Sequence, residues 1–305
     1  MLSKNKIFLL IYKKRIESNE GNNKLWCERT LITGKKYYMM LVSFLIMSIP
    51  YVLSLIVLVN IKSYYMIAIL SIFYGISIFV LIKGGCTDPG IIPRQMGSNE
   101  FHRKKSDFNI ISNGSFVQFS YCYTCNIIKP PRTSHCAACD NCCQRFDHHC
   151  LWLGNCVGKR NYKYFFFLVS TLNINAIIEI IYNICIIVQS VKDKEEKKIK
   201  YRTLTLTILS FVTFFDLMYV IVFLGRLQMV HTRLLINNFT FYEDFKKKIK
   251  NPANINPFYK NLWQHIYRLL LTLTPKSLLN GTIKRISKSI DINKGLNNNI
   301  LSIKK

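Results

Sequence analysis

Four long apolar stretches divide the chain, and they cover residues 37–61, 63–82, 164–191 and 203–225. Each has about the 20 residues that an α-helix needs to cross a bilayer. Pro50 interrupts the first stretch, where a membrane helix tolerates a kink. A buried core helix is the alternative for any single stretch, but two uncharged stretches separated only by Lys62 favour transmembrane helices. The pattern therefore predicts four of them.

The segments between and beyond these stretches are polar and basic. With four spans, residues 1–36, 83–163 and 226–305 lie on one side of the membrane, and they hold most of the 42 Lys and Arg residues. Loops rich in Lys and Arg usually stay in the cytoplasm. We therefore expect cytosolic termini and a cytosolic middle segment. No run in residues 1–36 combines a basic start, a short apolar core and a small-residue cleavage site, so we interpret this segment as a cytosolic arm and not as a signal peptide.

Two features follow the last apolar stretch. Thr240 and Glu243 have the spacing of a capping box, which predicts the start of a helix. Further on, six apolar residues fall on one helical face, which indicates either an amphipathic helix at the membrane surface or a short helix packed on the cytosolic part. These residues are Phe258, Leu262, Ile266, Leu269, Leu270 and Leu273. The Asn-rich tail after residue 293 is expected to be disordered.

Composition and charge agree with a membrane protein. Half of the residues are hydrophobic although the net charge is +26. The four spans exclude a basic zinc protein that binds nucleic acid. Glu179, Asp216, Asn173 and Asn175 fall within predicted spans, where polar groups are costly against lipid, so they should face the helix bundle or a cavity. A channel or transporter would explain the two acidic residues but would leave the cysteines without a role.

The candidate chemistry lies between the second and third stretches. Most of the 11 Cys residues fall between Cys122 and Cys156, together with His135, His148 and His149. C-x-x-C pairs with His at short spacing are typical of tetrahedral Zn²⁺ sites. A disulfide framework is the alternative, and the His residues disfavour it. Two four-ligand sites would leave three candidate groups for other chemistry, and the spacing alone does not say which three.

A run of residues from Cys122 to Phe165 resembles the cysteine-rich domain of the DHHC protein S-acyltransferases. Its pattern is C-x2-C-x9-HC-x2-C-x2-C-x4-DHHC-x5-C-x4-N-x3-F. Three flanking segments resemble that family's other motifs: Asp88-Pro89-Gly90, the Thr240 to Glu243 segment with Phe241 in place of a second Thr, and a shortened segment from Asn256 to Asn261. Leu151 stands where the family commonly has Pro.

The resemblance implies two interleaved structural Zn²⁺ sites. One would consist of Cys122, Cys125, His135 and Cys142, and the other of Cys136, Cys139, His149 and Cys156. Asp147, His148 and Cys150 remain for catalysis. In that reading Cys150 is the nucleophile, His148 takes the thiol proton, and Asp147 orients the imidazole. Cys143 is interpreted as an incidental thiol.

Further residues are candidates for binding acyl-CoA. The basic residues Lys129, Arg132, Lys159 and Arg160 flank the site and would suit the phosphates of CoA, although solvated charges would explain them equally. Asn175 lies roughly 16 Å along the third span. It would either cap a cavity for the acyl chain, which the resemblance implies, or form a hydrogen bond between helices.

The sequence therefore predicts an all-α membrane protein with a four-transmembrane-helix bundle and a small cytosolic zinc-binding cysteine-rich domain. That domain, residues 122–165, lies between the second and third helices. The helix pairs occupy 37–82 and 164–225, the cytosolic segments 1–36, 83–163 and 226–305.

The predicted function is a protein-cysteine S-palmitoyltransferase. It would pass a long-chain acyl group from palmitoyl-CoA, or another acyl-CoA, through Cys150 to a cysteine of a substrate protein. A zinc-dependent membrane adaptor without activity is the alternative, and it leaves His148 and Cys150 unexplained. Expected partners are acyl-CoA, the lipid bilayer and membrane-associated proteins with cytosolic cysteines, not nucleic acid. The resemblance favours the Golgi or another endomembrane over the plasma membrane.

Overall fold

The computed structural model describes most of the chain. It covers residues 21–27, 30–94, 107–112, 115–192 and 199–250, and single positions or short pieces at 261, 263, 266–267, 274–275 and 277–279. The predicted amphipathic helix lies largely outside the described residues, and the predicted disordered tail lies entirely outside them.

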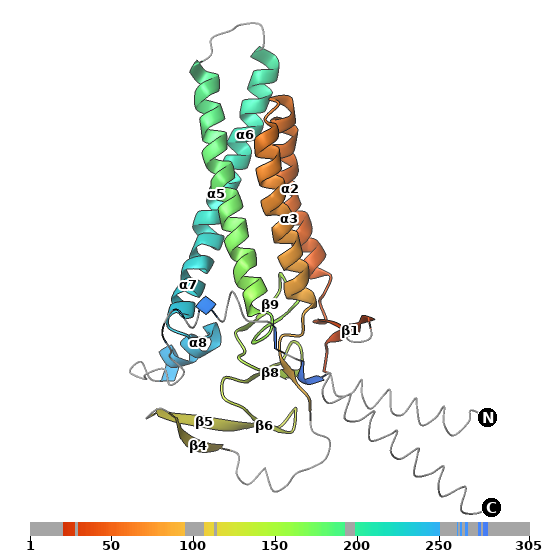
Figure 1. Ribbon diagram of the computed structural model, residues 1–305, viewed down its shortest axis with the longest axis vertical. Helices are drawn as coiled ribbons and strands as arrows, with labels where there is room; N and C mark the ends of the chain where they lie inside the picture. Colours follow the sequence, from red (N-terminus) through yellow and green to blue (C-terminus); the bar gives the residue numbers. More distant parts are fainter. Residues whose placement is uncertain are drawn as a thin grey trace, which may run out of the picture.

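Four long helices form a bundle, and the cysteine-rich segment lies at one end of it (Figure 1). The helices are α2 (Met39–Asn60), α3 (Tyr64–Cys86), α5 (Tyr162–Lys192) and α6 (Ile199–Tyr219). All four predicted apolar stretches are helical, and among the described residues four helices are long and apolar enough to cross a membrane. The prediction of four candidate membrane helices is confirmed.

The outer surface of the bundle is apolar. On α2, for example, Leu41, Ile49 and Val59 point away from the neighbouring helices and are 60%, 62% and 57% exposed. Contiguous apolar surface of this extent is rare on soluble monomers but is what lipid contacts require. Pro50 lies inside α2 without ending it. The bundle is therefore built for a hydrocarbon environment.

The fourth helix is longer than predicted. After α6 it passes through a π-helical turn, η3 (Val220–Leu224), and continues as α7 (Gly225–Ile236). The predicted span ended at residue 225, because Arg226, Gln228 and Arg233 lower the local hydropathy beyond that point. Burial of His231 and Leu234 holds this polar extension against the rest of the protein.

The cysteine-rich segment consists of short β-hairpins, so the prediction of an all-α fold holds only for the bundle. One sheet has the order β4-β5-β6, a second the order β3-β8-β7, and β9 pairs with β10; β1 and β2 form a separate hairpin. The strands are β1 (Lys24–Trp26), β2 (Leu31–Thr33), β3 (Ile91–Ile92), β4 (Asp107–Ser112), β5 (Ser115–Cys122), β6 (Ile127–Lys129), β7 (Ser134–Cys136), β8 (Asn141–Cys143), β9 (His148–Cys150) and β10 (Asn155–Val157).

Two buried asparagines fix the hairpins to the bundle. The Asn155 side-chain amide donates to the carbonyl oxygens of Ile32 and Gly85, both at 3.0 Å. The Asn161 amide donates to the carbonyl oxygen of Gly84 at 3.0 Å. Both amides thus satisfy carbonyl groups near the C-terminal end of α3, which lack partners within the helix. The strands that carry the candidate site are thereby held at a set position below α3.

Helix α8 (Phe241–Lys250) begins with the predicted capping box. The Thr240 backbone N–H donates to Glu243 Oε2 at 2.8 Å, and the Glu243 N–H donates to Thr240 Oγ1 at 3.2 Å. Each side chain therefore satisfies a backbone donor at the helix start. The prediction of a helix beginning here is confirmed.

Candidate functional site

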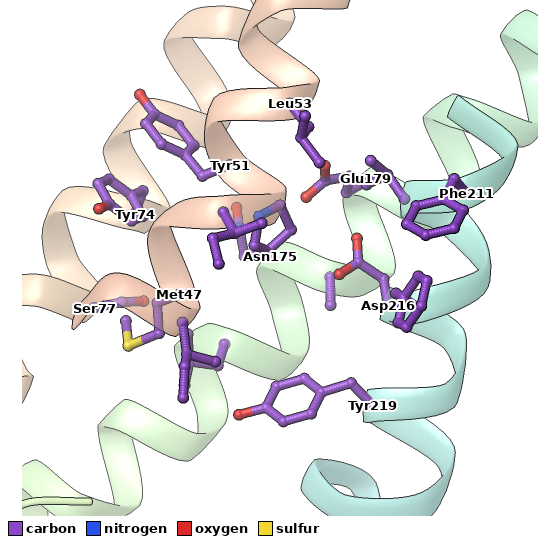
Figure 2. Close-up of a pocket in the computed structure, with 17 residues that line it drawn as sticks. Met47, Tyr51, Leu53, Tyr74, Ser77, Asn175, Glu179, Phe211, Asp216 and Tyr219 are labelled. Carbon is purple, nitrogen blue, oxygen red and sulfur yellow. The ribbon is translucent and has the colours of Figure 1, made fainter. Parts of the chain in front are cut away.

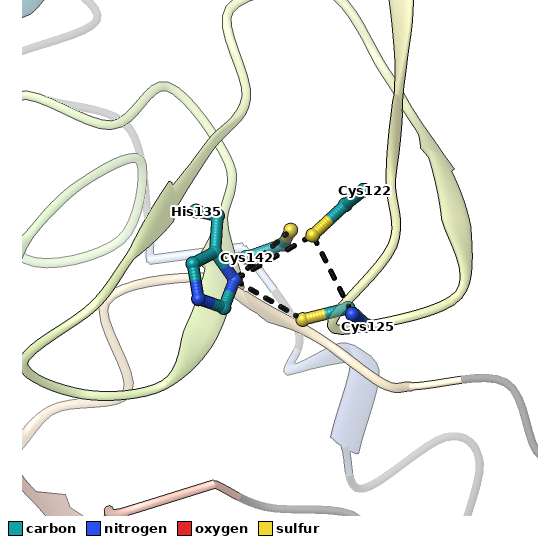
Figure 3. Close-up of side chains that lie close together, drawn as sticks. All are labelled: Cys122, Cys125, His135 and Cys142. Carbon is teal, nitrogen blue, oxygen red and sulfur yellow. Dashed lines mark hydrogen bonds between the residues drawn. The ribbon is translucent and has the colours of Figure 1, made fainter. Parts of the chain in front are cut away.

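The first predicted ligand set converges on a single point, with Cys122, Cys125 and Cys142 around the ring of His135 (Figure 3). The three sulfur atoms lie 3.6, 3.4 and 3.9 Å from His135 Nδ1. A tetrahedral ion with metal–sulfur bonds of about 2.3 Å and metal–nitrogen bonds of about 2.0 Å spaces its ligands about 3.6 Å apart. These residues fit such an ion.

The second set has the same geometry. His149 Nδ1 lies 3.7, 3.4 and 3.6 Å from the sulfur atoms of Cys136, Cys139 and Cys156. The sulfur atoms of Cys139 and Cys156 are 3.4 Å apart. Both predicted four-residue sets are therefore brought together as groups that could hold metal ions.

The protonation of the thiols also suits metal binding. A hydrogen bond from Cys142 is the main cause that lowers the pKa of the Cys125 thiol to about 5. In the second set, a hydrogen bond from Cys139 likewise lowers the pKa of Cys136. The same contacts raise the pKa of the partner thiols Cys142, Cys139 and Cys156, so in each set one sulfur atom gives up its proton before the others and offers the thiolate form that metals bind.

Strand β9 separates the metal ligand from the candidate catalytic pair. Successive side chains of a strand point to opposite faces, so His148 and Cys150 share one face and His149 lies on the other. Across the hairpin His149 is opposite Cys156, a member of the same ligand set. The sequence His-His-Cys therefore serves two sites at once.

Asp147, His148 and Cys150 lie together in one group. His148 Nδ1 lies 2.7 Å from Asp147 Oδ2, and the Cys150 thiol is close enough to the same ring to raise its pKa. The other carboxylate oxygen, Asp147 Oδ1, accepts the backbone N–H of Phe241 at 2.8 Å. Asp147 is 1% exposed and Cys150 is 4% exposed. The carboxylate is thus fixed on both sides and orients the imidazole towards the thiol.

Electrostatics favour a protonated imidazole beside the thiol. Burial alone lowers the pKa of His148, but the hydrogen bonds to Asp147 and Cys150 outweigh it and raise the pKa to about 9. Burial raises the pKa of Asp147, and the hydrogen bond from His148 and its charge reverse that effect, so the net pKa is lowered. Asp147 therefore stays ionised and His148 is able to hold a proton taken from Cys150.

Cys143 is built into the core. It is 1% exposed, and its thiol donates to the carbonyl oxygen of Pro89 at 3.5 Å. Burial raises the pKa of this thiol well above its usual value. A buried, protonated thiol is a poor nucleophile, which supports its interpretation as incidental.

The Cys150 thiol opens onto apolar space between the helices. It lines a cavity of about 80 Å³ together with Phe165, Leu168 and Val169. A larger cavity of about 350 Å³ lies further along the bundle (Figure 2). Both cavities are lined by the same four residues where they adjoin: Ile46, Met47, Leu172 and Tyr219. The two adjoining cavities, together called the passage below, extend from Cys150 into the bundle, and Asn175 lines the larger one.

Two of the four predicted CoA-binding residues make ion pairs within the chain. Arg132 Nε and Nη2 donate to Glu243 Oε1 and Oε2, each at 2.7 Å, and Nη2 also donates to the carbonyl oxygen of Asn238. Arg160 pairs with Asp88 at 2.7 Å. These contacts give both arginines a structural role. Binding of CoA by Arg132, Arg160, Lys129 and Lys159 stays a prediction.

His231 is a residue of the site that sequence reasoning missed. It is 2% exposed, and its ring centroid lies 4.8 Å from that of Phe165 and 5.9 Å from that of His148. Its Nδ1 lies 3.3 Å from the Tyr162 hydroxyl. It therefore packs beside the ring of His148. Only recognition that the fourth helix continues past residue 225 could have pointed to it.

The fold and the site define a class of protein: a bundle of four candidate membrane helices with two four-ligand metal-type sites and a buried Asp-His-Cys group. Residues 115–248 match the family model described as DHHC palmitoyltransferase. The chain is 33% identical over 219 residues to palmitoyltransferase ZDHHC18 from Homo sapiens, covering 65% of this chain and 55% of that protein. It is also 33% identical over 219 residues to palmitoyltransferase ZDHHC9 from Danio rerio, covering 66% of this chain and 56% of that protein.

These matches confirm the resemblance seen in the sequence. The chain carries the domain of the DHHC palmitoyltransferase family. It spans about half the length of the curated relatives that it matches.

Proposed function

We propose that this protein is a protein-cysteine S-palmitoyltransferase in which Cys150 carries the acyl group. The observation that supports this most directly is the position of Cys150, which contacts His148 on one side and lines the apolar passage on the other. A nucleophile needs a base, and a long acyl chain needs an apolar path. Cys150 has both. An adaptor without activity would need neither.

The proposed reaction has two steps that each exchange one thioester for another. In the first, His148 takes the proton of Cys150, and the thiolate attacks the carbonyl carbon of acyl-CoA. The bond to the CoA sulfur breaks, and His148 returns the proton to that sulfur. In the second, His148 takes the proton of a substrate cysteine, and that thiolate attacks the acyl-Cys150 carbonyl carbon. The bond from the acyl group to the Cys150 sulfur breaks, and His148 returns the proton to Cys150. Asp147 keeps the imidazole oriented and stabilises its cation in both steps.

The two ligand sets would hold Zn²⁺ as structural ions. Each supplies four protein ligands and so leaves no open position for chemistry. Zinc bound in this way contributes on the order of 10–16 kcal/mol to folding in small domains. Since His149 lies between His148 and Cys150 in β9, a metal at the second set would fix the strand that aims both residues. The proposed role of zinc is therefore to position the catalytic group.

The acyl chain would lie in the passage between the helices. Both cavities are lined mostly by apolar side chains. Asn175 lines the larger cavity, which has a volume of about 350 Å³. In this proposal Asn175 caps the chain, while Lys129, Arg132, Lys159 and Arg160 meet the CoA phosphates outside. The location of Lys129 in β6 and of Lys159 next to β10 is compatible with this, since both strands belong to the cysteine-rich segment.

The proposed orientation puts Cys150 on the cytosolic side of a Golgi or other endomembrane. The basic segments beside the cysteine-rich strands support it, because Lys and Arg are enriched in cytoplasmic loops. The free thiols of both ligand sets support it as well, because the cytosol keeps thiols reduced. Substrates would be membrane-associated proteins with a cysteine within reach of that surface.

The test is formation of the acyl-enzyme. Full-length protein in phosphatidylcholine nanodiscs is incubated with labelled palmitoyl-CoA, and hydroxylamine-sensitive label is measured together with bound zinc. We expect label on the wild type and on Cys185→Ala, which removes an exposed thiol from α5. Cys150→Ala should carry no label but should keep two zinc ions. Absence of label on a wild type that retains both zinc ions would favour the adaptor.

A further inference from the structure

Two acidic side chains meet inside the bundle, far from the metal-type sites. Glu179 from α5 and Asp216 from α6 both line the cavity of about 350 Å³ (Figure 2). They are 3% and 6% exposed. Glu179 Oε1 is hydrogen-bonded to the Ser54 hydroxyl of α2. Both carboxyl groups are therefore enclosed by helices.

The cavity supplies no positive charge to balance them. Among the described residues that line it, none is Lys, Arg or His. The neighbouring helices α2 and α3 contribute only uncharged side chains, such as Ser54, Tyr74 and Ser77. Carboxylates in the membrane interior normally pair with a cation or face water, since isolated charge is costly there. Within the described chain the pair must therefore either hold protons or accept a cation from a ligand.

Two acceptor atoms in the cavity are also unused. Asp216 Oδ2 and Asn175 Oδ1 are buried and have no hydrogen-bond partner among the described residues. Buried acceptors without partners are unusual and call for a donor. Together with the Glu179 carboxylate they offer three acceptors on two helices. A primary ammonium group has three N–H donors and one positive charge, so it satisfies both needs.

The other residues that line the cavity indicate the chemical character of the rest of the ligand. Apart from the polar end at Glu179 and Asp216, the cavity is lined by apolar side chains such as Met47, Leu172 and Phe215. Its volume falls at the lower end of the range for small-molecule sites, about 300–1,000 Å³, and far exceeds that of a bare ion. We infer that this cavity binds an amphiphile with a long apolar body and a primary ammonium group, which sits between Glu179 and Asp216.

Such a ligand would share the passage that leads to Cys150. The residues between the acidic pair and Cys150 include Leu172 and Tyr219, which line both cavities. An apolar body lying there would fill the space that the proposed function gives to the acyl chain. The binding itself requires no acyl transfer, so it is measured independently of that function.

The experiment compares dodecylamine with 1-dodecanol. Full-length protein in phosphatidylcholine nanodiscs is unfolded by heat with either compound at equal mole fraction in the membrane. We expect dodecylamine to raise the unfolding midpoint of the wild type by roughly 3 °C or more at saturation. Dodecanol has the same chain without the charge and should give a much smaller shift.

The variants assign the effect to the acidic pair. In Glu179→Gln/Asp216→Asn the two compounds should give equal shifts, and Asp216→Asn alone should lose most of the difference. Asp244→Asn, which removes an acidic charge from α8 outside the bundle, should behave like the wild type. If the double variant fails to fold, the Asp216→Asn comparison decides. Equal shifts from amine and alcohol in the wild type, an amine shift retained in Asp216→Asn, or the same shift from NaCl or CaCl₂ alone would overturn the inference.

Discussion

His148 and His149 are neighbours in β9, yet their rings belong to different sites. His148 Nδ1 is 2.7 Å from the Asp147 carboxylate, and His149 Nδ1 is 3.4 Å from the sulfur atom of Cys139. The alternation of a β-strand separates them, because consecutive side chains point to opposite faces. The two adjacent histidines therefore belong to two different groups of side chains, the proposed catalytic group and the second ligand set.

The first prediction follows from that separation. His148→Ala should lose most acyl-enzyme formation and keep two zinc ions, because only the proton acceptor is removed. His149→Ala should lose about one zinc ion per chain, and its activity should fall together with its stability. Metal analysis of the two purified variants provides the measurement. Equal zinc content in both variants would show that the two histidines are wrongly assigned.

The second prediction concerns the second ligand set. Cys136→Ala removes one of four ligands, so we expect loss of that zinc ion and unfolding of the hairpins, with a large part of the zinc contribution of about 10–16 kcal/mol lost. Trypsin sensitivity of residues 122–157 and zinc content together report it. Cys27→Ala, which removes an exposed thiol outside both sets, is the control and should change neither. A Cys136→Ala protein with both zinc ions would contradict the ligand assignment.

The third prediction concerns the start of α8. Thr240→Ala removes the hydroxyl that accepts the Glu243 N–H, and loss of such a cap costs about 1 kcal/mol. Because Phe241 N–H is bonded to Asp147 at 2.8 Å, we also expect slower acyl-enzyme formation. Thermal unfolding and single-turnover acylation measure the two effects. Thr213→Ala, whose hydroxyl only bonds within α6, is the matched control and should leave acylation unchanged.

The fourth prediction concerns acyl chain length. If Asn175 caps the chain, a larger side chain shortens the available space and a smaller one lengthens it. Asn175→Trp should shift preference towards shorter acyl-CoA, and Asn175→Ala towards longer. Competition between C14, C16 and C18 acyl-CoA measures the preference. An unchanged profile in both active variants would mean that the cavity ends at other residues.

Local sequence patterns predicted the elements that depend on neighbours in the chain. Continuous apolar residues gave the four helices, and the spacing of Thr240 and Glu243 gave the start of α8. The ligand sets could be predicted because Cys and His residues at short spacing are typical of a tetrahedral metal site. In each case the physical cause acts over a few tens of residues at most.

Contacts between distant segments could not be predicted in the same way. Nothing in the local sequence links Arg132 to Glu243, which are 111 residues apart, or places His231 beside His148. Most of the β-strands were missed because strands of two or three residues give no periodicity; β4 and β5, with 6 and 8 residues, are the exceptions. The cavity that joins Asn175, Glu179 and Asp216 depends on how α5 and α6 pack, and a single sequence does not fix that packing.

The double use of Glu243 has a mechanical consequence. The Glu243 carboxylate accepts the Thr240 backbone N–H at the start of α8 and also pairs with Arg132 in the cysteine-rich segment. The neighbouring Phe241 N–H donates to the Asp147 carboxylate. The fourth helix leads directly into this junction through α7. Helices tilt when the thickness of the surrounding bilayer changes. A tilt of α7 would therefore move the start of α8 and, through Phe241, the Asp147 carboxylate that orients His148. In this way the thickness of the host membrane would affect the alignment of the proposed catalytic residues.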